Sequence, residues 1–432
     1  MDSILIEGGH PLSGEVEASG AKNASLPLMA AALLAESPSR LQGIPRLQDI
    51  VTMSAMLERL GARVARVERR GDPHGDLAID PTDFADLEAP YDLVRRMRAS
   101  IYVLGPLLGR FGHARVSLPG GCAIGTRPID LHLRGMEALG AKVAIDHGYV
   151  DARAPQGRLR GADCIIEGPN GSSVGATCNV LMAAVSAKGR SVLRGAAREP
   201  EVEDLIGFLN AMGARIKGAG TSVLEVEGVE GLRGAERRVI PDRIEAGTLL
   251  VAAAITKGDV AVRGCIPERL AEVLVKLEEM GVEIERGEDR VRARYAGRLR
   301  PLAVRTMPYP GFPTDMQAQL MAALCLAAGE STITETIYPD RFIHVAELHR
   351  MGADITLAHA TAVVRGVEKL SGASVMASDL RASAALVLAG LAAEGETECL
   401  RVYHLDRGYE QLERKLSQLG AVIERVRYRR TQ

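Results

Sequence analysis

A cysteine in a glycine-rich loop is the residue whose type and sequence neighbours most clearly suggest acid–base or nucleophilic chemistry. The segment PGGCAIGTRPID contains Cys122 after two glycines, followed by Arg127 and Asp130. A polar loop of this kind does not favour burial, and a nearby cation lowers the pKa of a thiol below its usual value of ~8.5. The segment therefore indicates a reactive thiol. The alternative is an inert thiol beside an ordinary turn.

Charged and polar side chains recur at two kinds of position. One kind stands at the start of each of six apolar segments, and the other stands in loops that follow short strands. The basic members come from equivalent positions of the repeated units. If the two halves of the chain face each other, these side chains converge on one positive cleft, where helix N-termini also favour anions. The first kind comprises Lys22, Arg98, Ser173, Arg243, Asp315 and Arg381, and the second comprises Cys122, Arg127, Asp130, Glu199, Arg341 and Arg407.

These side chains also have ordinary structural interpretations. A single arginine in a loop is most often a solvated surface charge. Asp315 could cap the helix that begins beside it as readily as act on a substrate, and Asp379 is well placed as an N-cap for the segment that contains Arg381. The shared position in repeated units is what favours a common anion site.

Six copies of one sequence pattern set these positions. The phrase LERLGARV at Leu57 returns in five related forms, each with apolar residues three apart and a glycine shortly before a strand-like segment. The pattern predicts the end of a helix, a left-handed turn at the glycine and the start of a strand. The six glycines are Gly61, Gly140, Gly213, Gly281, Gly352 and Gly420.

An apolar segment and a short strand precede each of these phrases. SLPLMAAALLAE and ASAALVLAGLAAEGE are examples that are apolar on nearly every side, which is typical of a buried helix. The unit is therefore a buried helix, a strand, a loop, a second helix, a glycine turn and one or two further strands. Stacked units of this size often form an open solenoid. Buried helices need sheet on several sides, however, which favours two closed groups of three units.

Length and charge limit the class of protein. A chain of 432 residues suggests two or three domains, and a formal net charge of −2 lacks the basic excess of a non-specific nucleic-acid binder. The opening MDSILIEGGH does not resemble a signal peptide, and the stretch LPLMAAALLA is far shorter than the ~20 residues that span a bilayer. We therefore expect a cytoplasmic protein with no nucleic-acid or membrane partner.

Patterns for metals and nucleotide cofactors do not occur in the sequence. The six cysteines are scattered with no CxxC pair, which indicates free thiols. There is no His, Cys and Asp set with metal-ligand spacing, no P-loop and no GxGxxG. We expect no metal and no cofactor.

Ten segments that contain these residues resemble one family, the UDP-N-acetylglucosamine 1-carboxyvinyltransferases, which are enolpyruvyl transferases. The resemblance runs from the first strand to the last helix, and the motifs occur in the family's order. Any single motif is weakly specific, but together they are highly specific. The segments are SGAKNAS, YDLVRRMRAS, SLPGGCAIGTRPIDLH, SVGAT, AAREPE, PDRIEAGT, FPTDMQAQ, RFIHVAELHRMGA, ASDLRAS and DRGYE.

The resemblance implies an α/β fold of two inside-out α/β barrel domains, each made of three βαβαββ repeats with helices inside and sheets outside. Residues 22–240 would form the first domain, which carries the Cys122 loop. Residues 241–432 would form the second, completed by the N-terminal strand in residues 1–21. The active site would lie in the cleft between the domains.

The resemblance also implies an activity and its small-molecule partners. The enolpyruvyl group of phosphoenolpyruvate would move to the 3'-hydroxyl of UDP-N-acetylglucosamine by addition and elimination through a tetrahedral intermediate, with release of phosphate. This is the first committed step of peptidoglycan synthesis, and with it of cell-wall growth, cell shape and cell division. The family's inhibitor fosfomycin would act on the same site.

Site residues follow from the matched motifs. Cys122 would be the acid for the methylene carbon, Asp315 the base near the sugar hydroxyl, and Lys22 and Arg407 further catalytic groups. Phosphoenolpyruvate would contact Lys22, Asn23, Arg127, Arg341, Asp379, Arg381 and Arg407. The nucleotide sugar would contact Asn23, Arg98, Arg127, Pro128, Ile129, Asp130, Leu131, Ser173, Val174, Gly175, Asp315 and Ile337.

Two alternatives remain at this stage. The sister transferase that uses shikimate 3-phosphate shares the repeat fold and the donor, although PGGCAIGTRP and FPTDMQAQ favour the UDP-sugar enzyme. A catalytically silent paralogue with a regulatory role is the other, and intact Lys22, Cys122, Asp315 and Arg407 argue against it. The segment EGPNGSSVGATCNV, which approaches Ser173 by a longer route than in some relatives, bears only on contacts to the uridine.

Overall fold

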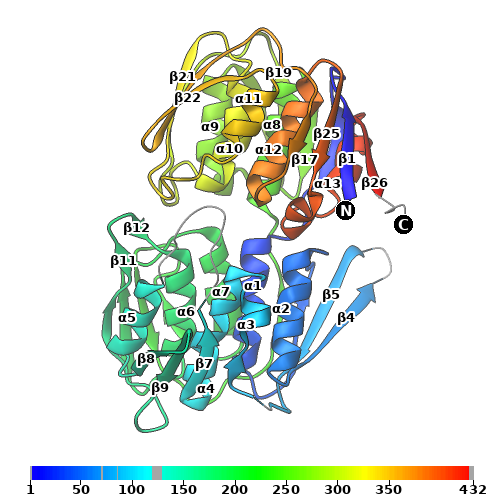
Figure 1. Ribbon diagram of the computed structural model, residues 1–432. Helices are drawn as coiled ribbons and strands as arrows, with labels where there is room; N and C mark the ends of the chain where they lie inside the picture. The colour runs from blue at the N-terminus through cyan, green and yellow to red at the C-terminus, as the bar shows by residue number, and fades with distance from the viewer. Residues whose placement is uncertain (1, 70–71, 85, 119–128, 428–432) are drawn as a thin grey trace. The chain divides into compact units, whose positions relative to one another are not determined.

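The computed structural model describes residues 2–69, 72–84, 86–118 and 129–427 (Figure 1). These residues divide into two compact units. The N-unit contains the described residues from 20 to 240, and the C-unit contains residues up to 19 together with those from 241 onward. Each unit has its own core, because the two clusters of buried apolar side chains share no residue. No helix in the described parts of the chain is long and apolar enough to cross a membrane.

A helix that is buried along most of its length stands at the centre of each repeat. Small side chains, alanine above all, let these helices approach closely, and in the C-unit all three pack against one another. The prediction of six buried helices is confirmed. They are α1 (Lys22–Ala31), α4 (Leu104–Phe111) and α6 (Val174–Ala184) in the N-unit, and α8 (Arg243–Ile255), α10 (Gln317–Leu324) and α12 (Leu380–Ala392) in the C-unit.

Each buried helix leads through a strand and a loop into a second, amphipathic helix. In the first repeat, for example, the second helix buries Ile50, Met53 and Leu57 and exposes its other side. The strands are β3 (Ser39–Gln42), β7 (His113–Ser117), β13 (Arg190–Arg194), β17 (Asp259–Arg263), β21 (Glu330–Thr334) and β25 (Glu396–Leu400). The second helices are α2 (Gln48–Arg59), α5 (Asp130–Ala138), α7 (Pro200–Ala211), α9 (Ala271–Glu279), α11 (Val345–Arg350) and α13 (Leu412–Gln418).

The glycine turns that end the second helices are confirmed in all six repeats. The glycines at positions 61, 140, 213, 281, 352 and 420 have φ between 87° and 110°. Other L-residues avoid this region because the Cβ meets the backbone, whereas glycine enters it without that cost. The repeated glycine is therefore required by the turn from helix to strand.

Six four-stranded sheets share one pairing scheme. The strand that follows the buried helix pairs in parallel with a lead strand on one side and antiparallel with a return strand on the other. The lead strands are β16 (Glu236–Arg238), β6 (Glu88–Ala89), β10 (Asp163–Ile165), β2 (Ser13–Glu17), β20 (Ala303–Arg305) and β24 (Ser374–Met376). The return strands are β5 (Asp72–Asp80), β9 (Tyr149–Arg153), β15 (Val223–Glu227), β19 (Arg290–Tyr295), β23 (Thr361–Arg365) and β1 (Asp2–Glu7).

An outer strand completes each sheet beyond the return strand. These six strands are β4 (Arg63–Arg69), β8 (Lys142–Asp146), β14 (Arg215–Lys217), β18 (Val282–Arg286), β22 (Asp354–Ala358) and β26 (Val422–Arg427). A two-stranded ribbon of β11 (Glu167–Gly168) and β12 (Gly171–Ser172) precedes α6.

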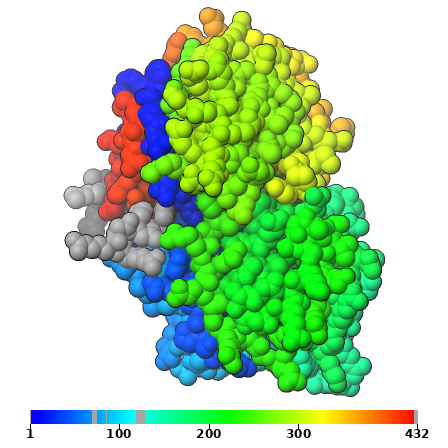
Figure 2. Space-filling model, turned by 180° about the vertical axis from the view of Figure 1, so that it is seen from behind, coloured from blue at the N-terminus to red at the C-terminus, as the bar shows by residue number. Residues whose placement is uncertain are grey.

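Four of the pairings join segments that are far apart in the sequence. In the N-unit, β16 at the end of the unit pairs with β3 in its first repeat. In the C-unit, β2 pairs with β17, and β1 lies between β25 and β26, as Figure 1 shows. Figure 2 shows the blue N-terminal segment beside the red C-terminal one. In an open solenoid each repeat contacts only its neighbours. These pairings join the first and last repeats of a unit, so the open solenoid is wrong.

The buried helix begins differently from the simple prediction in two repeats. Arg98 opens a 3₁₀ turn, η2 (Arg98–Val103), and only then does α4 begin; Asp315 lies in a second such turn, η4 (Thr314–Met316), before α10. Pro106 in the first turn of α4 explains the first case, because its ring would clash with the carbonyl group four residues earlier in a continuous α-helix. Arg98 and Asp315 thus lie before the start of a buried helix, as predicted, but in 3₁₀ turns that are tighter than an α-helix.

Candidate active site

In the C-unit, one carboxylate is held between two buried guanidinium groups. Asp315 Oδ1 accepts a hydrogen bond from Arg341 Nη1 at 2.9 Å, and Asp315 Oδ2 accepts one from Arg381 Nη2 at 3.1 Å. The two arginines are 5% and 1% exposed, whereas the Asp315 side chain remains 26% exposed. The cluster joins the fifth repeat, which supplies Asp315 and Arg341, to the sixth, which supplies Arg381.

Carboxylates keep the buried arginines charged. Burial alone would lower the pKa of Arg341, but Asp315 and Asp379 raise it above the ordinary value. Burial acts in the same way on Arg381, and Asp315 and Tyr409 raise its pKa well above the ordinary value. The guanidinium of Arg381 also lies over the Tyr409 ring, 5.2 Å from its centre, which stabilises the cation further. Such fixed cations suit an anionic ligand.

The two aspartates near these arginines have different tasks. Asp379 is the N-cap of α12, and its Oδ1 accepts hydrogen bonds from the backbone N–H groups of Arg381 and Ala382, so the predicted cap is confirmed. The same interpretation is wrong for Asp315. The N-cap of α10 is Met316, and both oxygens of Asp315 receive arginine N–H groups instead.

A buried hydrogen-bond network holds the Tyr409 ring that packs against Arg381. Tyr409 is 1% exposed, and its hydroxyl group lies 2.9 Å from Thr248 Oγ1 and 3.0 Å from Gln319 Nε2. Gln319 Nε2 also donates to the backbone oxygen of Asp315 at 2.9 Å. The aromatic ring that holds Arg381 is therefore tied to the same turn that carries Asp315.

Arg341 and Arg407 occupy equivalent loops, as the repeat predicts. Arg341 lies between β21 and α11, and half-buried Arg407 ends the 3₁₀ turn η5 (Val402–Arg407) between β25 and α13. A Cβ on the next residue, Gly408, would come within 2.4 Å of the Leu380 side chain. The backbone after Arg407 thus packs against the first residue of α12, the helix that carries Arg381.

In the N-unit, Lys22 is the first residue of α1 and forms a buried ion pair. Its Nζ lies 3.1 Å from Asp49 Oδ2, and the two side chains are 10% and 4% exposed. Asp49 lies in the first turn of α2, so the ion pair joins α1 and α2, the two helices of the first repeat. Asn23 follows Lys22 in α1 and is half-buried.

The small residues before Lys22 serve the protein itself at one position. A Cβ on Gly20 would lie 2.1 Å from the backbone oxygen of Gly43. The glycine in SGAKNAS therefore permits a close approach of two backbone segments.

A second buried cluster surrounds His132 in α5. The Oδ1 of Asn179 accepts from the Gly105 N–H at 2.6 Å, so its amide nitrogen faces the carbonyl of Ile101 at 2.9 Å and His132 Nδ1 at 3.0 Å. Since that nitrogen only donates, His132 Nδ1 accepts and the ring proton stays on Nε2. Burial, and then the charge of Arg98, lower the pKa of His132 to about 4.

Some of the residues predicted to contact the nucleotide sugar lie near this histidine, whereas Asn23 lies in α1, and Asp315 and Ile337 lie in the C-unit. A Cβ on Gly175 would lie 3.2 Å from the His132 ring, and Ser173 Oγ caps α6 by accepting from Ala176 N. Ile129 is the N-cap of α5, and exposed Asp130 pairs with Arg134. Ile129, Asp130, Leu131, Ser173, Val174 and Gly175 thus stand at the starts of α5 and α6, whereas Cys122, Arg127 and Pro128 lie outside the described residues.

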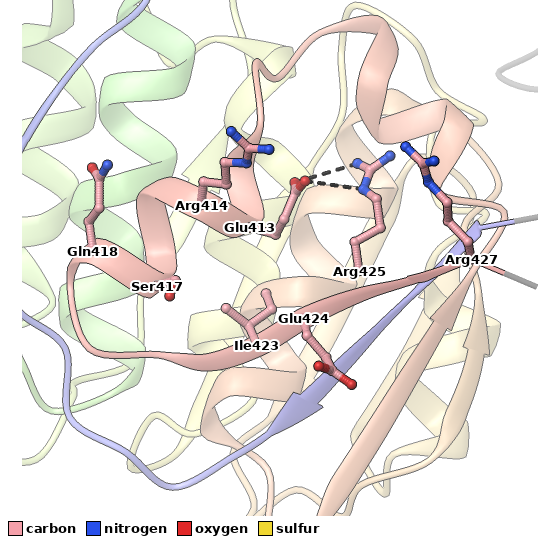
Figure 3. A pocket seen from close by; sticks show the side chains of 8 residues that line it. All are labelled: Glu413, Arg414, Ser417, Gln418, Ile423, Glu424, Arg425 and Arg427. Carbon is pink, nitrogen blue, oxygen red and sulfur yellow. Dashed lines mark hydrogen bonds and ion pairs between the residues drawn. The ribbon is translucent and has the colours of Figure 1, made fainter.

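A hollow of about 460 Å³ in the C-unit lies between α13 and β26 and does not contain the predicted site residues (Figure 3). Figure 3 shows Arg425 pointing toward Glu413, with which it forms hydrogen bonds. Arg425 also pairs with Asp406, so the charge of its guanidinium is already balanced. The exposed Arg414 lines the same hollow.

Several residues of these clusters carry no sequence signal of their own. Asp49, His132 and Tyr409 are ordinary members of amphipathic or apolar segments, and only the folded chain brings them to the predicted residues. DRGYE and RPIDLH do contain Tyr409 and His132. Within the described ranges, no group of three or more His, Cys, Asp or Glu side chains could hold a metal ion.

Comparison with known proteins identifies the family of the chain and supports its fold. The model of a family described as EPSP synthase (3-phosphoshikimate 1-carboxyvinyltransferase) matches residues 6–416. The solved enolpyruvyl transferase NikO from Streptomyces tendae superimposes with a TM-score of 0.86 and 28% identity over 98% of each chain. EPSP synthase from Acinetobacter baumannii, at 19% identity and a TM-score of 0.75, supports the mixed α/β fold alone.

Curated relatives are more similar still. UDP-N-acetylglucosamine 1-carboxyvinyltransferase of Anaeromyxobacter sp. (strain K) is 57% identical over 99% of this chain and 100% of its own. The enzyme of that name from Gluconacetobacter diazotrophicus is 55% identical over the same shares. The chain therefore belongs to the enolpyruvyl transferase family, among the UDP-N-acetylglucosamine 1-carboxyvinyltransferases, and is a transferase. The resemblance seen in the sequence is confirmed.

The neutral state of His132 predicts a pH dependence of stability. Its folded pKa of about 4 lies below the usual ~6.5, so the unfolded chain binds more protons between these values and stability falls as the pH drops through that range. We expect about 2 kcal/mol of the unfolding free energy to be lost from this cause between pH 7 and pH 5. Urea unfolding of wild type and His132→Asn at both pH values measures it.

The His132→Asn variant removes the titration and keeps the bond, because the amide oxygen of the new side chain can still accept from Asn179. His147, whose side chain is 87% exposed, is the control, and His147→Asn should retain the full pH dependence. An equal pH dependence in wild type and His132→Asn would show that His132 contributes nothing to it.

Proposed function

We propose that this protein transfers the enolpyruvyl group of phosphoenolpyruvate to the 3'-hydroxyl of UDP-N-acetylglucosamine and releases phosphate. The observation that carries the proposal is Asp315 held between buried Arg341 and Arg381, in a chain 57% identical to an enzyme of that name. The product would be the first committed intermediate of peptidoglycan. Both substrates are charged and cross lipid bilayers poorly, so the proposal requires a cytoplasmic enzyme.

Charge explains why the donor would need this cluster. Phosphoenolpyruvate carries about three negative charges, and a site that excludes water must offset them with fixed cations. Lys22, Arg341, Arg381 and Arg407 are the described candidates, with Arg127 from the Cys122 loop. Planar guanidinium groups bond carboxylate and phosphate oxygens in pairs, which orients the donor as well as binding it.

The reaction we propose is an addition followed by an elimination. The Cys122 thiol gives its proton to the methylene carbon, and the 3'-oxygen of the sugar forms a bond to the central carbon as Asp315 takes the hydroxyl proton. The tetrahedral intermediate then returns a proton from the new methyl group to the Cys122 thiolate and expels phosphate, which restores the double bond. A carboxylate oxygen has two lone pairs, so a hydrogen bond from an arginine does not by itself prevent it from accepting a proton.

We further propose that each unit is an inside-out barrel of three βαβαββ repeats. The domains would be residues 22–240, and residues 241–432 completed by the strand in residues 1–21. The pairing of β1 with β25 and β26, and the mutual packing of α8, α10 and α12, support this assignment. The Lys22 and His132 clusters of the N-unit and the Asp315 cluster of the C-unit would each contribute to binding the substrates.

Acceptor identity is the first test. We expect purified protein to release phosphate from phosphoenolpyruvate with UDP-N-acetylglucosamine and not with shikimate 3-phosphate, because the matched motifs are those of the UDP-sugar enzymes. A coupled phosphate assay with each acceptor measures this, and chelator should leave the rate unchanged. Equal turnover of the two acceptors, or turnover of neither, would refute the proposed function.

Arg407 tests the donor site. Arg407→Ala should remove a charge-assisted contact to phosphoenolpyruvate and weaken transition-state binding by about 2–4 kcal/mol, measured as kcat/KM for the donor. Arg414→Ala is the matched control, because Arg414 lies on the adjacent α13 and lines the separate hollow. If both variants match wild type at low donor concentration, Arg407 is a surface charge.

Cys122 tests the proposed acid. The five described cysteines are at most 2% exposed, and burial raises the pKa of each, for example to about 11 for Cys164 and about 12 for Cys265. We therefore expect the epoxide fosfomycin to label Cys122 first, and faster when UDP-N-acetylglucosamine is bound. Peptide mapping by mass spectrometry identifies the labelled thiol.

Two substitutions sharpen this test. Cys122→Ser should bind the nucleotide sugar but turn over poorly, because a serine hydroxyl does not ionise in this pH range. Cys122→Asp should keep part of the activity and resist the epoxide, since a carboxyl group can also donate a proton. Normal turnover by Cys122→Ser, or first labelling at another cysteine, would exclude Cys122 as the acid.

A further inference from the structure

A fully buried carboxylate beneath the Asp315 cluster has no role in the mechanism above. Glu335 follows β21 and is 0% exposed. Its Oε1 accepts hydrogen bonds from Thr306 Oγ1 at 2.7 Å, Ile337 N at 2.9 Å and Tyr338 N at 3.0 Å. Its Oε2 accepts one from Thr314 Oγ1 at 2.8 Å. Four donors meet the carboxylate, so it acts only as an acceptor.

The two oxygens of Glu335 serve different parts of the site. Oε1 fixes the turn that contains Ile337, a residue predicted to contact the nucleotide sugar. Oε2 accepts a hydrogen bond from the Thr314 hydroxyl group. The oxygen of the same hydroxyl group accepts a hydrogen bond from Arg341 Nη1 at 2.9 Å. Arg341 Nη1 in turn donates to Asp315 Oδ1 at 2.9 Å.

This order of donors and acceptors gives the chain of bonds a direction. A hydroxyl group can point its hydrogen at either neighbour, and at an arginine it must accept. With its proton committed to Glu335, Thr314 presents a lone pair to Arg341, and that bond fixes where the guanidinium meets Asp315. Arg381 holds only the other oxygen, Oδ2.

We propose that Glu335 is a positioning residue that sets the orientation of the Asp315 carboxylate through Thr314 and Arg341, while holding the turn at Ile337 for the nucleotide sugar. The inference rests on the proposed function, because it takes Asp315 as the base. Its two branches predict separate kinetic effects. The Thr314 branch should affect kcat, and the Ile337 branch should affect binding of UDP-N-acetylglucosamine.

Glu335→Gln separates the two branches. Two backbone N–H groups face Oε1, so the amide oxygen of the substituted side chain should take that place and leave its NH₂ facing Thr314. The turn at Ile337 would be kept. The Thr314 hydroxyl group, however, would face two donors, the new NH₂ group and Arg341, and its own hydrogen would no longer have Glu335 as an acceptor. We expect kcat to fall about 10-fold or more, with the Kd for UDP-N-acetylglucosamine within about 2-fold of wild type by calorimetry.

Thr314 provides the partner variants. Thr314→Val should lower kcat as Glu335→Gln does, and Thr314→Ser should restore it because the hydroxyl group returns. In the double variant Glu335→Gln/Thr314→Val the losses should not multiply, since both act through one bond. Thr334→Val is the control: Thr334 precedes Glu335, and its hydroxyl group lies 3.0 Å from Thr361 Oγ1, outside this chain of bonds.

The outcomes are distinct from those that test the function. If wild type turns over neither acceptor, the proposed function fails, and the calorimetric Kd values still report on the Ile337 branch. If wild type is active and Glu335→Gln retains kcat within about 2-fold, or Thr314→Ser is as slow as Thr314→Val, the positioning role is overturned. A fall in kcat shared by Thr334→Val would show a general loss of packing instead.

Discussion

The architecture of the C-unit depends on one shared charge, the Asp315 carboxylate between two buried guanidinium groups. Burying either arginine without a carboxylate partner would be costly. Removing the Asp315 carboxylate would leave both guanidinium groups without this partner in a region of low dielectric, and we expect a loss of about 3–5 kcal/mol or more of the free energy of unfolding. The three side chains come from two repeats: Asp315 from the turn η4, Arg341 from a loop and Arg381 from helix α12. The cluster therefore requires that the repeats pack in a fixed relation, which the mutual contact of α8, α10 and α12 provides.

Support for this charge comes from groups that never need to touch a substrate. Tyr409 lies under Arg381, Gln319 links Tyr409 to the Asp315 turn, and Glu335 reaches Arg341 through Thr314. A carboxylate with rigid partners loses little freedom when a ligand arrives, which is the general condition for electrostatic catalysis. The N-unit is built in the same manner, with Asp49 beneath Lys22 and Asn179 beside His132.

Much of this fold is encoded locally and can be predicted from the sequence. The glycine turns and the buried alanine-rich helices follow from backbone sterics and apolar periodicity, and both were confirmed. The cap at Asp379 was predicted from its place before the helix. Asp315 has the same place, yet it pairs with arginines because those arginines are buried nearby, and burial is a property of the folded chain. For the same reason His132, Glu335 and Tyr409 were not recognised from sequence position alone.

The N-terminal strands have a consequence for how the chain folds during synthesis. Residues 20–240 are contiguous, so every described strand of the N-unit, including β16, is translated before the rest of the C-unit. In the C-unit, β1 cannot pair until β25 and β26 have been translated. Ile4 and Ile6, which are 0% exposed in the folded protein, cannot be buried in this sheet before then. Strand β1 is thus made before the N-unit but completes its own sheet only after the N-unit has been made.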